Sequence, residues 1–138
     1  MEVDRNGLEV LDADECVRLL GTRSIGRIGI TSEALPTILP VDYVVADGQV
    51  LFRTGAGTKL EAATHHAVVA FEVDDVDEAT GTGWSVVVTG VAEAHPGDVA
   101  DATDLGRLRR WVAGRDGHVV AIPLDRVTGR RLDRPGSG

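Results

Sequence analysis

Residues 36–54 read PTILPVDYVVADGQVLFRT and predict two antiparallel strands joined by a tight turn. The runs Pro36–Ala46 and Gln49–Thr54 are rich in valine, isoleucine and leucine, residues that suit strands. Asp47-Gly48, which lies between them, is typical of a two-residue hairpin turn. An apolar run upstream, Ser24–Thr31, predicts a third strand, so the simplest arrangement is a meander.

The rest of the chain contains more predicted strands than helices. Further strands are expected at Ala67–Val73, Trp84–Ala94, His118–Leu124 and Arg126–Leu132, and helices at Leu11–Gly21, Thr58–His65 and Asp98–Val112. Gly90, inside the longest strand, predicts a bulge or a bend. A doubly wound parallel sheet needs a helix after each strand, so the order favours a mainly β fold, an antiparallel barrel that is closed or half closed.

Length and charge limit the classes of protein that the chain fits. A chain of 138 residues with 43% hydrophobic content predicts one domain, 1–138, with a core at about 10–132 and a flexible C-terminal tail at 133–138. The formal net charge of −8 argues against nucleic acid as a partner, because that binding needs clustered basic residues. The N-terminus lacks the apolar core of a signal peptide, and no stretch approaches ~18 apolar residues. A cytoplasmic protein without a membrane partner is therefore expected.

Lys59 is the only lysine in the chain, against thirteen arginines. It follows Arg53, Thr54 and Thr58 along a loop of small residues, so two cations, two hydroxyls and loop amides lie close together in the sequence. These groups are suited to holding a phosphate at the start of a helix. Two structural explanations stay open, because GC-rich codon usage depletes lysine everywhere and Thr58 with Glu61 forms a helix-capping pair.

No residue pattern indicates a catalytic group or a metal site. Cys16 lies among apolar residues and is interpreted as a buried structural thiol. His65-His66 are neighbours that do not face one another on a helix, and the acidic run Glu72–Glu78, interpreted as a solvated hairpin end, lacks the spacing of a calcium loop. Catalytic residues are unknown and no metal is predicted. A phosphate-binding loop without acid–base machinery suits a protein whose bound cofactor carries the chemistry.

Five segments along residues 10–132 together resemble a known family. They are Ile38–Tyr43, Asp47–Thr54, Gly57–Lys59, Val69–Asp74 and Gly83–Gly90. Their order and spacing resemble the FMN-binding split-barrel family, the pyridoxamine 5′-phosphate oxidase-like group. The resemblance implies a six-stranded antiparallel split β-barrel and a homodimer with two flavin sites at its interface. It also implies an FMN-dependent oxidoreductase whose small-molecule substrate and electron donor are unknown.

The resemblance also implies a set of cofactor-binding positions. They are Pro40, Val41, Asp42, Arg53, Thr54, Thr58, Lys59, Trp84, Ser85 and Trp111. The first three match the strand along the isoalloxazine ring, and the next four match the segment that holds the FMN phosphate and ribityl chain. Trp84 and Ser85 match a pair near the flavin. Trp111 is a candidate for an aromatic contact across the dimer interface, with packing of its own helix as the alternative.

Other readings of the same residues stay open. The segment RVTGRR at 126–131 differs from the basic residues that hold the substrate phosphate in the true pyridoxamine phosphate oxidases, which argues against vitamin oxidation. A deazaflavin coenzyme is the alternative cofactor. Its acidic tail would need basic surface, for which the candidates are Arg107, Arg109, Arg110, Arg130 and Arg131. A non-enzymatic flavin-binding sensor or storage dimer, or a barrel that has lost its cofactor, is also consistent with the sequence.

Overall fold

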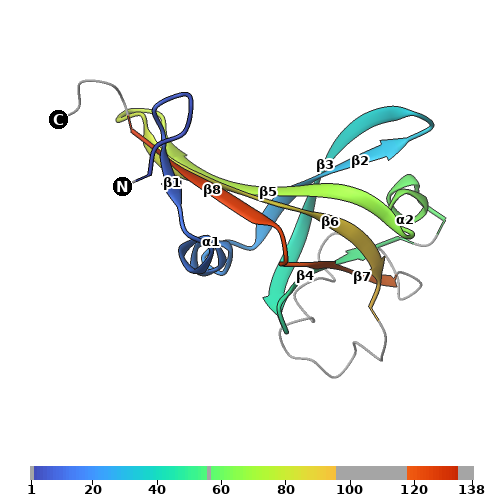
Figure 1. Ribbon diagram of the computed structural model, residues 1–138. Helices are drawn as coiled ribbons and strands as arrows, with labels where there is room; N and C mark the ends of the chain where they lie inside the picture. Colours follow the sequence, from blue (N-terminus) through green and yellow to red (C-terminus); the bar gives the residue numbers. More distant parts are fainter. Residues whose placement is uncertain (1, 56, 96–117, 134–138) are drawn as a thin grey trace.

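The computed structural model describes residues 2–55, 57–95 and 118–133, which form curved antiparallel sheet and two short helices (Figure 1). The strands are β1 (Glu9–Leu11), β2 (Ile25–Ser32), β3 (Leu35–Ala46), β4 (Gln49–Thr54), β5 (Ala67–Asp77), β6 (Thr82–Ala94), β7 (His118–Pro123) and β8 (Val127–Leu132). The helices are α1 (Ala13–Leu20) and α2 (Lys59–Ala63). The helix expected at Asp98–Val112, with Trp111, and the tail from residue 134 lie outside the described residues.

Six of the strands close into a ring. The strand order is β1-β8-β6-β5-β2-β3-β4-β7, and β6 also pairs with β7. This second pairing joins β2 to β7 into a six-stranded antiparallel barrel, from which β8 and then β1 continue the sheet beyond β6. The predicted mainly β barrel with short helices is confirmed.

The hairpin at residues 35–54 has the turn that its sequence predicts. Asp47 and Gly48 have φ angles of 54° and 70°, the left-handed values of a type I′ turn. The turn sets Ala46 opposite Gln49 and fixes the register of β3 against β4. The predicted bounds of β4 are confirmed, and β3 begins one residue earlier than expected, at Leu35.

The long strand β6 belongs to two parts of the sheet. Its pairing with β5 runs without a break from Ala67 opposite Ala92 to Asp77 opposite Thr82, so the bulge expected at Gly90 is wrong. Instead, β6 pairs with β8 as far as Val88 and then with β7 from Glu93. Gly90 lies where β6 changes partner, and Figure 1 shows the strand curving there.

The main core lies inside the ring and beneath α1. Tyr43 and Phe71 are fully buried and meet edge to face, with ring centroids 4.9 Å apart. Cys16 of α1 is fully buried, and a Cβ built at Gly129 of β8 would stand 2.5 Å from its Sγ, so helix and sheet are in close contact. Burial raises the pKa of the Cys16 thiol. Both observations support the structural role expected for this cysteine.

Replacing Asp12 with alanine is expected to lower the free energy of unfolding by about 1 kcal/mol. The Asp12 carboxylate is the N-cap of α1 and accepts a hydrogen bond of 2.8 Å from the Glu15 backbone N–H. Urea unfolding measures the loss. Asp14→Ala, in the exposed first turn of the same helix, is the matched control and should cost about 0.5 kcal/mol or less. Equal losses in the two variants would contradict the capping role.

Candidate functional site

Arg53 and Thr54 lie at the end of β4, beside β7. Their cross-strand partners are Val119 and His118. Thr54 is fully buried, and its hydroxyl donates to the carbonyl oxygen of His118 at 3.4 Å. The Nε atom of Arg53 is also buried, yet it has no hydrogen-bond partner among the residues that the structure describes. A buried guanidinium nitrogen without an acceptor is costly, and an anion beside it would supply one.

The loop before α2 is held together by its own hydrogen bonds. Thr58 is the N-cap of α2, and its Oγ accepts from the Glu61 N–H at 3.1 Å while its proton goes to the Gly55 carbonyl at 2.7 Å. In return, Glu61 Oε1 accepts from the Gly57 N–H at 3.2 Å. The predicted capping pair is confirmed, although the reciprocal bond goes to Gly57 and not to Thr58.

These bonds narrow the groups that a phosphate could use. Phosphate oxygens need donors, and the protons of Thr54, Thr58 and Gly57 are already engaged inside the protein. The two cations remain. Lys59 is exposed, and within the described ranges neither Lys59 nor Arg53 forms an ion pair with a carboxylate. The phosphate-binding capacity of this segment therefore rests on Arg53 and Lys59.

The strand β3 places its three predicted residues on two faces. Val41 is buried in the barrel core, whereas Pro40 and Asp42 lie on the opposite, outer face. The register that pairs Tyr43 with Phe52 sets Asp42 opposite Arg53 one step further along. Pro40 in turn pairs with a residue of β2, Arg27. Pro40, Asp42 and Arg53 thus share one side of the sheet.

Trp84 and Ser85 are also separated by the alternation of a strand. Trp84 is 8% exposed and belongs to the core cluster, so its ring lies on the inner side. Ser85 faces the other way, and its hydroxyl donates to Glu72 Oε2 at 3.2 Å. The structure therefore brings Ser85, but not Trp84, to the outer face that carries Pro40.

The outer face holds a charged cluster that the sequence analysis missed. Arg27 of β2 pairs with Glu72 of β5, and its Nη1 lies 3.5 Å from Glu72 Oε1 and 3.6 Å from Asp74 Oδ2. Burial and the neighbouring Asp74 raise the pKa of Glu72 to about 7, against the opposing effects of Ser85 and Arg27. Glu72 and Asp74 were expected at a solvated hairpin end. That is wrong, because both lie within β5 and contact a neighbouring strand.

A hollow of about 360 Å³ indents this face. Its walls are Arg27, Gly29, Ile38, Ala70, Glu72, Asp74 and Val87, which come from four adjacent strands. The signal available in the sequence was the two-residue spacing of Glu72 and Asp74, which puts two carboxylates on one face of a strand. The cation that meets them comes from β2, far away in the chain, so only the register reveals the cluster.

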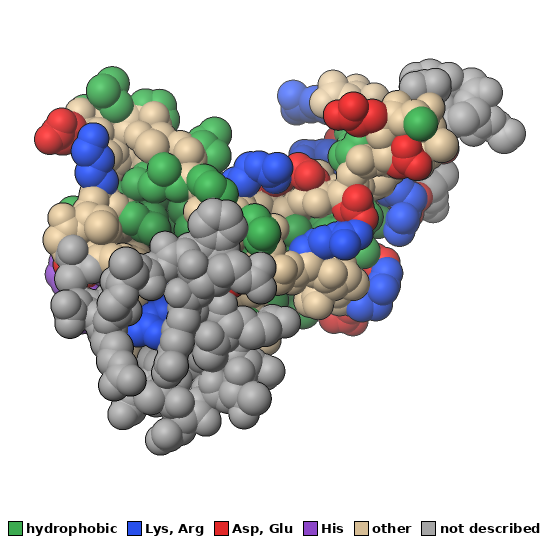
Figure 2. Space-filling view, turned by 180° about the vertical axis from the view of Figure 1, so that it is seen from behind, with side chains coloured by type: hydrophobic (Ala, Val, Ile, Leu, Met, Phe, Trp, Pro, Cys, Tyr) green, Lys and Arg blue, Asp and Glu red, His purple; other side chains and the backbone are tan. Residues whose placement is uncertain are grey.

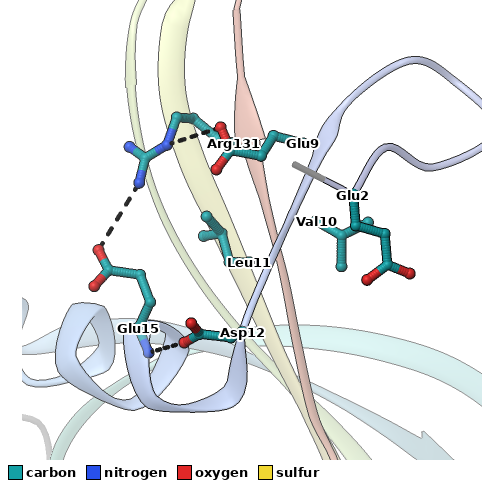
Figure 3. Close-up of a pocket in the computed structure, with 7 residues that line it drawn as sticks. All are labelled: Glu2, Glu9, Val10, Leu11, Asp12, Glu15 and Arg131. Atoms are coloured by element: carbon teal, nitrogen blue, oxygen red, sulfur yellow. Dashed lines mark hydrogen bonds and ion pairs between the residues drawn. The ribbon is translucent and has the colours of Figure 1, made fainter.

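A second hollow, of about 420 Å³, lies between β1 and α1 (Figure 3). Four carboxylates, of Glu2, Glu9, Asp12 and Glu15, line it, and Arg131 is its one cation. Arg131 Nε is 3.7 Å from Glu9 Oε1 and its Nη2 is 3.8 Å from Glu15 Oε1. Such a site repels anions, and none of the predicted cofactor-binding residues lines it.

The described residues contain neither a helix long and apolar enough to cross a bilayer nor a group of three metal-binding side chains. The chemistry of the outer face therefore depends on its cations, its carboxylates and its apolar wall.

The raised pKa of Glu72 predicts a pH-dependent stability. Between the ordinary carboxyl pKa of 4.5 and about 7, the folded chain binds more protons than the unfolded chain, so the free energy of unfolding falls as the pH rises. Glu72→Gln is expected to remove this fall and to be more stable than the wild type above neutral pH, by about 1 kcal/mol after allowance for solvent screening. Denaturant unfolding across this pH range measures it. Glu78→Gln, in the exposed β5–β6 turn, should keep the wild-type slope.

Comparison with known proteins identifies relatives across most of the chain. The family model described as pyridoxamine 5′-phosphate oxidase matches residues 12–131. The uncharacterized protein Rv0080 of Mycobacterium tuberculosis is 42% identical over 131 residues, which cover 88% of this chain and 84% of that protein. Among solved structures, the FAD binding protein from Mycobacterium smegmatis is 35% identical, with a TM-score of 0.70 and coverage of 90% and 97% of the two chains. A putative pyridoxamine 5′-phosphate oxidase from Corynebacterium glutamicum is 28% identical, with a TM-score of 0.73 and coverage of 92% and 99%.

Proposed function

Because the chain belongs to the pyridoxamine 5′-phosphate oxidase family, we propose that it is a flavin-dependent oxidoreductase acting on a small molecule. The observation that carries this proposal is the Nε of Arg53, a buried donor without a partner among the described residues, on the same segment as the unpaired Lys59. A flavin nucleotide carries the phosphate that two such cations would hold.

The outer face supplies the remaining contacts of the proposal. Arg53 and Lys59 would hold the phosphate, and Pro40 and Asp42 would lie along the ring, since both share the face of Arg53. Ser85 offers a hydroxyl on the same face. When bound, a flavin supplies hydride or electron transfer, so the protein has only to orient the ring and leave one side open to a substrate.

The cofactor is proposed to be FMN, as the sequence resemblance implied, with FAD as a second candidate. FAD is favoured by the Mycobacterium smegmatis relative, which is described as an FAD binding protein. Both cofactors carry the same ring and a phosphate at the same end of the ribityl chain. A deazaflavin has less support, because two of its candidate cations are engaged: Arg130 Nε is 2.6 Å from Asp4 Oδ2, and Arg131 pairs with Glu9 and Glu15.

A homodimer is part of the proposal, and the outer face is its proposed interface. Four large apolar side chains on β2, β3, β5 and β6 are exposed by 41% to 72%: Ile25, Ile38, Val68 and Val91. Figure 2 shows hydrophobic side chains gathered toward the β2–β3 end of the molecule, next to charged ones. An exposed apolar group of this kind is typical of interaction surfaces. Sedimentation measurements test the dimer. Cytoplasmic location stays a prediction.

An absorption spectrum of the purified protein, with mass spectrometry of what it releases on denaturation, tests the cofactor. Release of FMN or FAD supports the proposal, and release of a deazaflavin redirects it. Failure to take up any of the three on incubation would overturn it. Reduction of the yellow protein by a nicotinamide donor, followed by reoxidation with a quinone or a nitro compound, separates an oxidoreductase from a protein that only binds flavin.

A further inference from the structure

The hollow on the outer face has an apolar side and a charged side. Ile38, Ala70 and Val87 line one side with aliphatic groups, and Gly29 keeps the floor low. Arg27, Glu72 and Asp74 line the other side. Such a surface accepts a flat ring on its apolar part and a polar substituent at its edge.

The charges of the hollow do not balance. Two carboxylates share one guanidinium at 3.5 and 3.6 Å, distances too long for strong charge-assisted hydrogen bonds. On β6 the group facing Glu72 is the uncharged hydroxyl of Ser85. The cation nearest in register is Arg130 of β8, opposite Ser85, and it pairs with Asp4. The raised pKa of Glu72 has the same origin, since its ionised form lacks a full counter-charge.

We propose that this hollow binds the substrate of the protein, a small planar molecule that presents a cationic amidinium-like or protonated amino group to Glu72 and Asp74. The inference rests on the proposed function, because the hollow reaches Ile38, two residues along β3 from Pro40 and on the same face. A substrate there lies beside the proposed ring. In the proposed dimer, the partner copy would enclose it.

The proposal specifies charge, pH dependence and the residues responsible. A cation supplies the counter-charge that Glu72 lacks, so binding lowers the pKa of this carboxyl and releases a proton. The affinity for a cation therefore rises as the pH increases through neutrality. Asp74 adds a second negative charge, whereas Arg27 disfavours the cation and maintains the positions of the two carboxylates.

Benzamidine, benzamide and benzoate are matched probes, since they share a ring and differ in the charge of the substituent. With the full chain, calorimetry or NMR titration is expected to show benzamidine binding at least about ten-fold more tightly than benzoate, with benzamide between them. The benzamidine affinity should increase between about pH 6 and pH 8. Glu72→Gln should weaken it about ten-fold, and Asp74→Asn should weaken it in the same direction. Glu78→Gln, which removes a carboxylate from the exposed turn, should leave it unchanged.

Two results would overturn the proposal: equal binding of benzoate and benzamidine, or a benzamidine affinity that neither carboxylate variant changes. Flavin uptake is recorded separately by absorbance for each variant. A protein that binds flavin but does not discriminate among the probes refutes only the substrate class. A protein that takes up no flavin refutes the proposed function, while the probe titration still reports on the hollow.

Discussion

Replacing Arg53 with methionine is expected to weaken flavin binding by about 1.5 to 3 kcal/mol, roughly 10- to 100-fold in Kd. The substitution keeps most of the aliphatic stem and removes the guanidinium whose Nε is buried without a partner in the described chain. Lys59→Ala is expected to act in the same direction, with the smaller loss of the two, because Lys59 is exposed and its charge is screened by water. Fluorescence titration of FMN or FAD with cofactor-free protein measures both.

Arg126→Met is the matched control for Arg53→Met. Arg126 is an exposed arginine next to β8, outside the proposed cofactor face, and its loss should leave the flavin affinity as it is. Flavin affinities that stay at the wild-type value in both Arg53→Met and Lys59→Ala would return this segment to a purely structural role. In that case the capped loop before α2 would be explained by its own hydrogen bonds alone.

Gly26→Ala is expected to lower the free energy of unfolding by about 2 kcal/mol, because overpacking a well-filled core forces rings and backbone to shift. A Cβ at Gly26 would stand 2.5 Å from Phe71 Cζ and 2.8 Å from its Cε2. The Phe71 ring is fully buried against Tyr43, so it has little room to move away. Thermal and denaturant unfolding measure the loss.

Gly29→Ala provides a control on the same strand. Gly29 faces outward, and a Cβ there meets the Ala70 carbonyl oxygen at 3.7 Å, an ordinary contact. Its effect on the free energy of unfolding should stay within about 0.5 kcal/mol. If Gly29→Ala destabilised the protein as much as Gly26→Ala, the loss would come from strand propensity and not from the contact with Phe71.

Local features of this fold could be predicted because their causes lie within a few residues. Asp47-Gly48 determines the turn between β3 and β4 by its backbone preference alone. Asp12 and Thr58 cap their helices by bonding to an N–H three residues on. The candidate phosphate segment was found in the same way, from the neighbours of Lys59.

The functional side of the sheet depends on facts that a single stretch does not contain. Trp84 and Ser85 are adjacent in sequence, yet the pleat sends them to opposite faces. The cluster of Arg27, Glu72 and Ser85 comes from three strands, and only their register brings it together. The loop hydroxyl of Thr58, expected to serve a phosphate, is instead consumed by capping.

The ring of strands closes at a narrow seam. Glu93 opposite Ala121 and Ala94 opposite Val120 are the pairs that join β6 to β7, with a further bond of 2.8 Å from the His95 N–H to the Val119 carbonyl. By contrast, β5 and β6 pair along their full common length. Local opening takes place where the fewest bonds must break, so amide hydrogens at the seam should exchange with solvent before those of the β5–β6 hairpin. The barrel can thus breathe at β7 while the strands beneath the hollow keep their alignment.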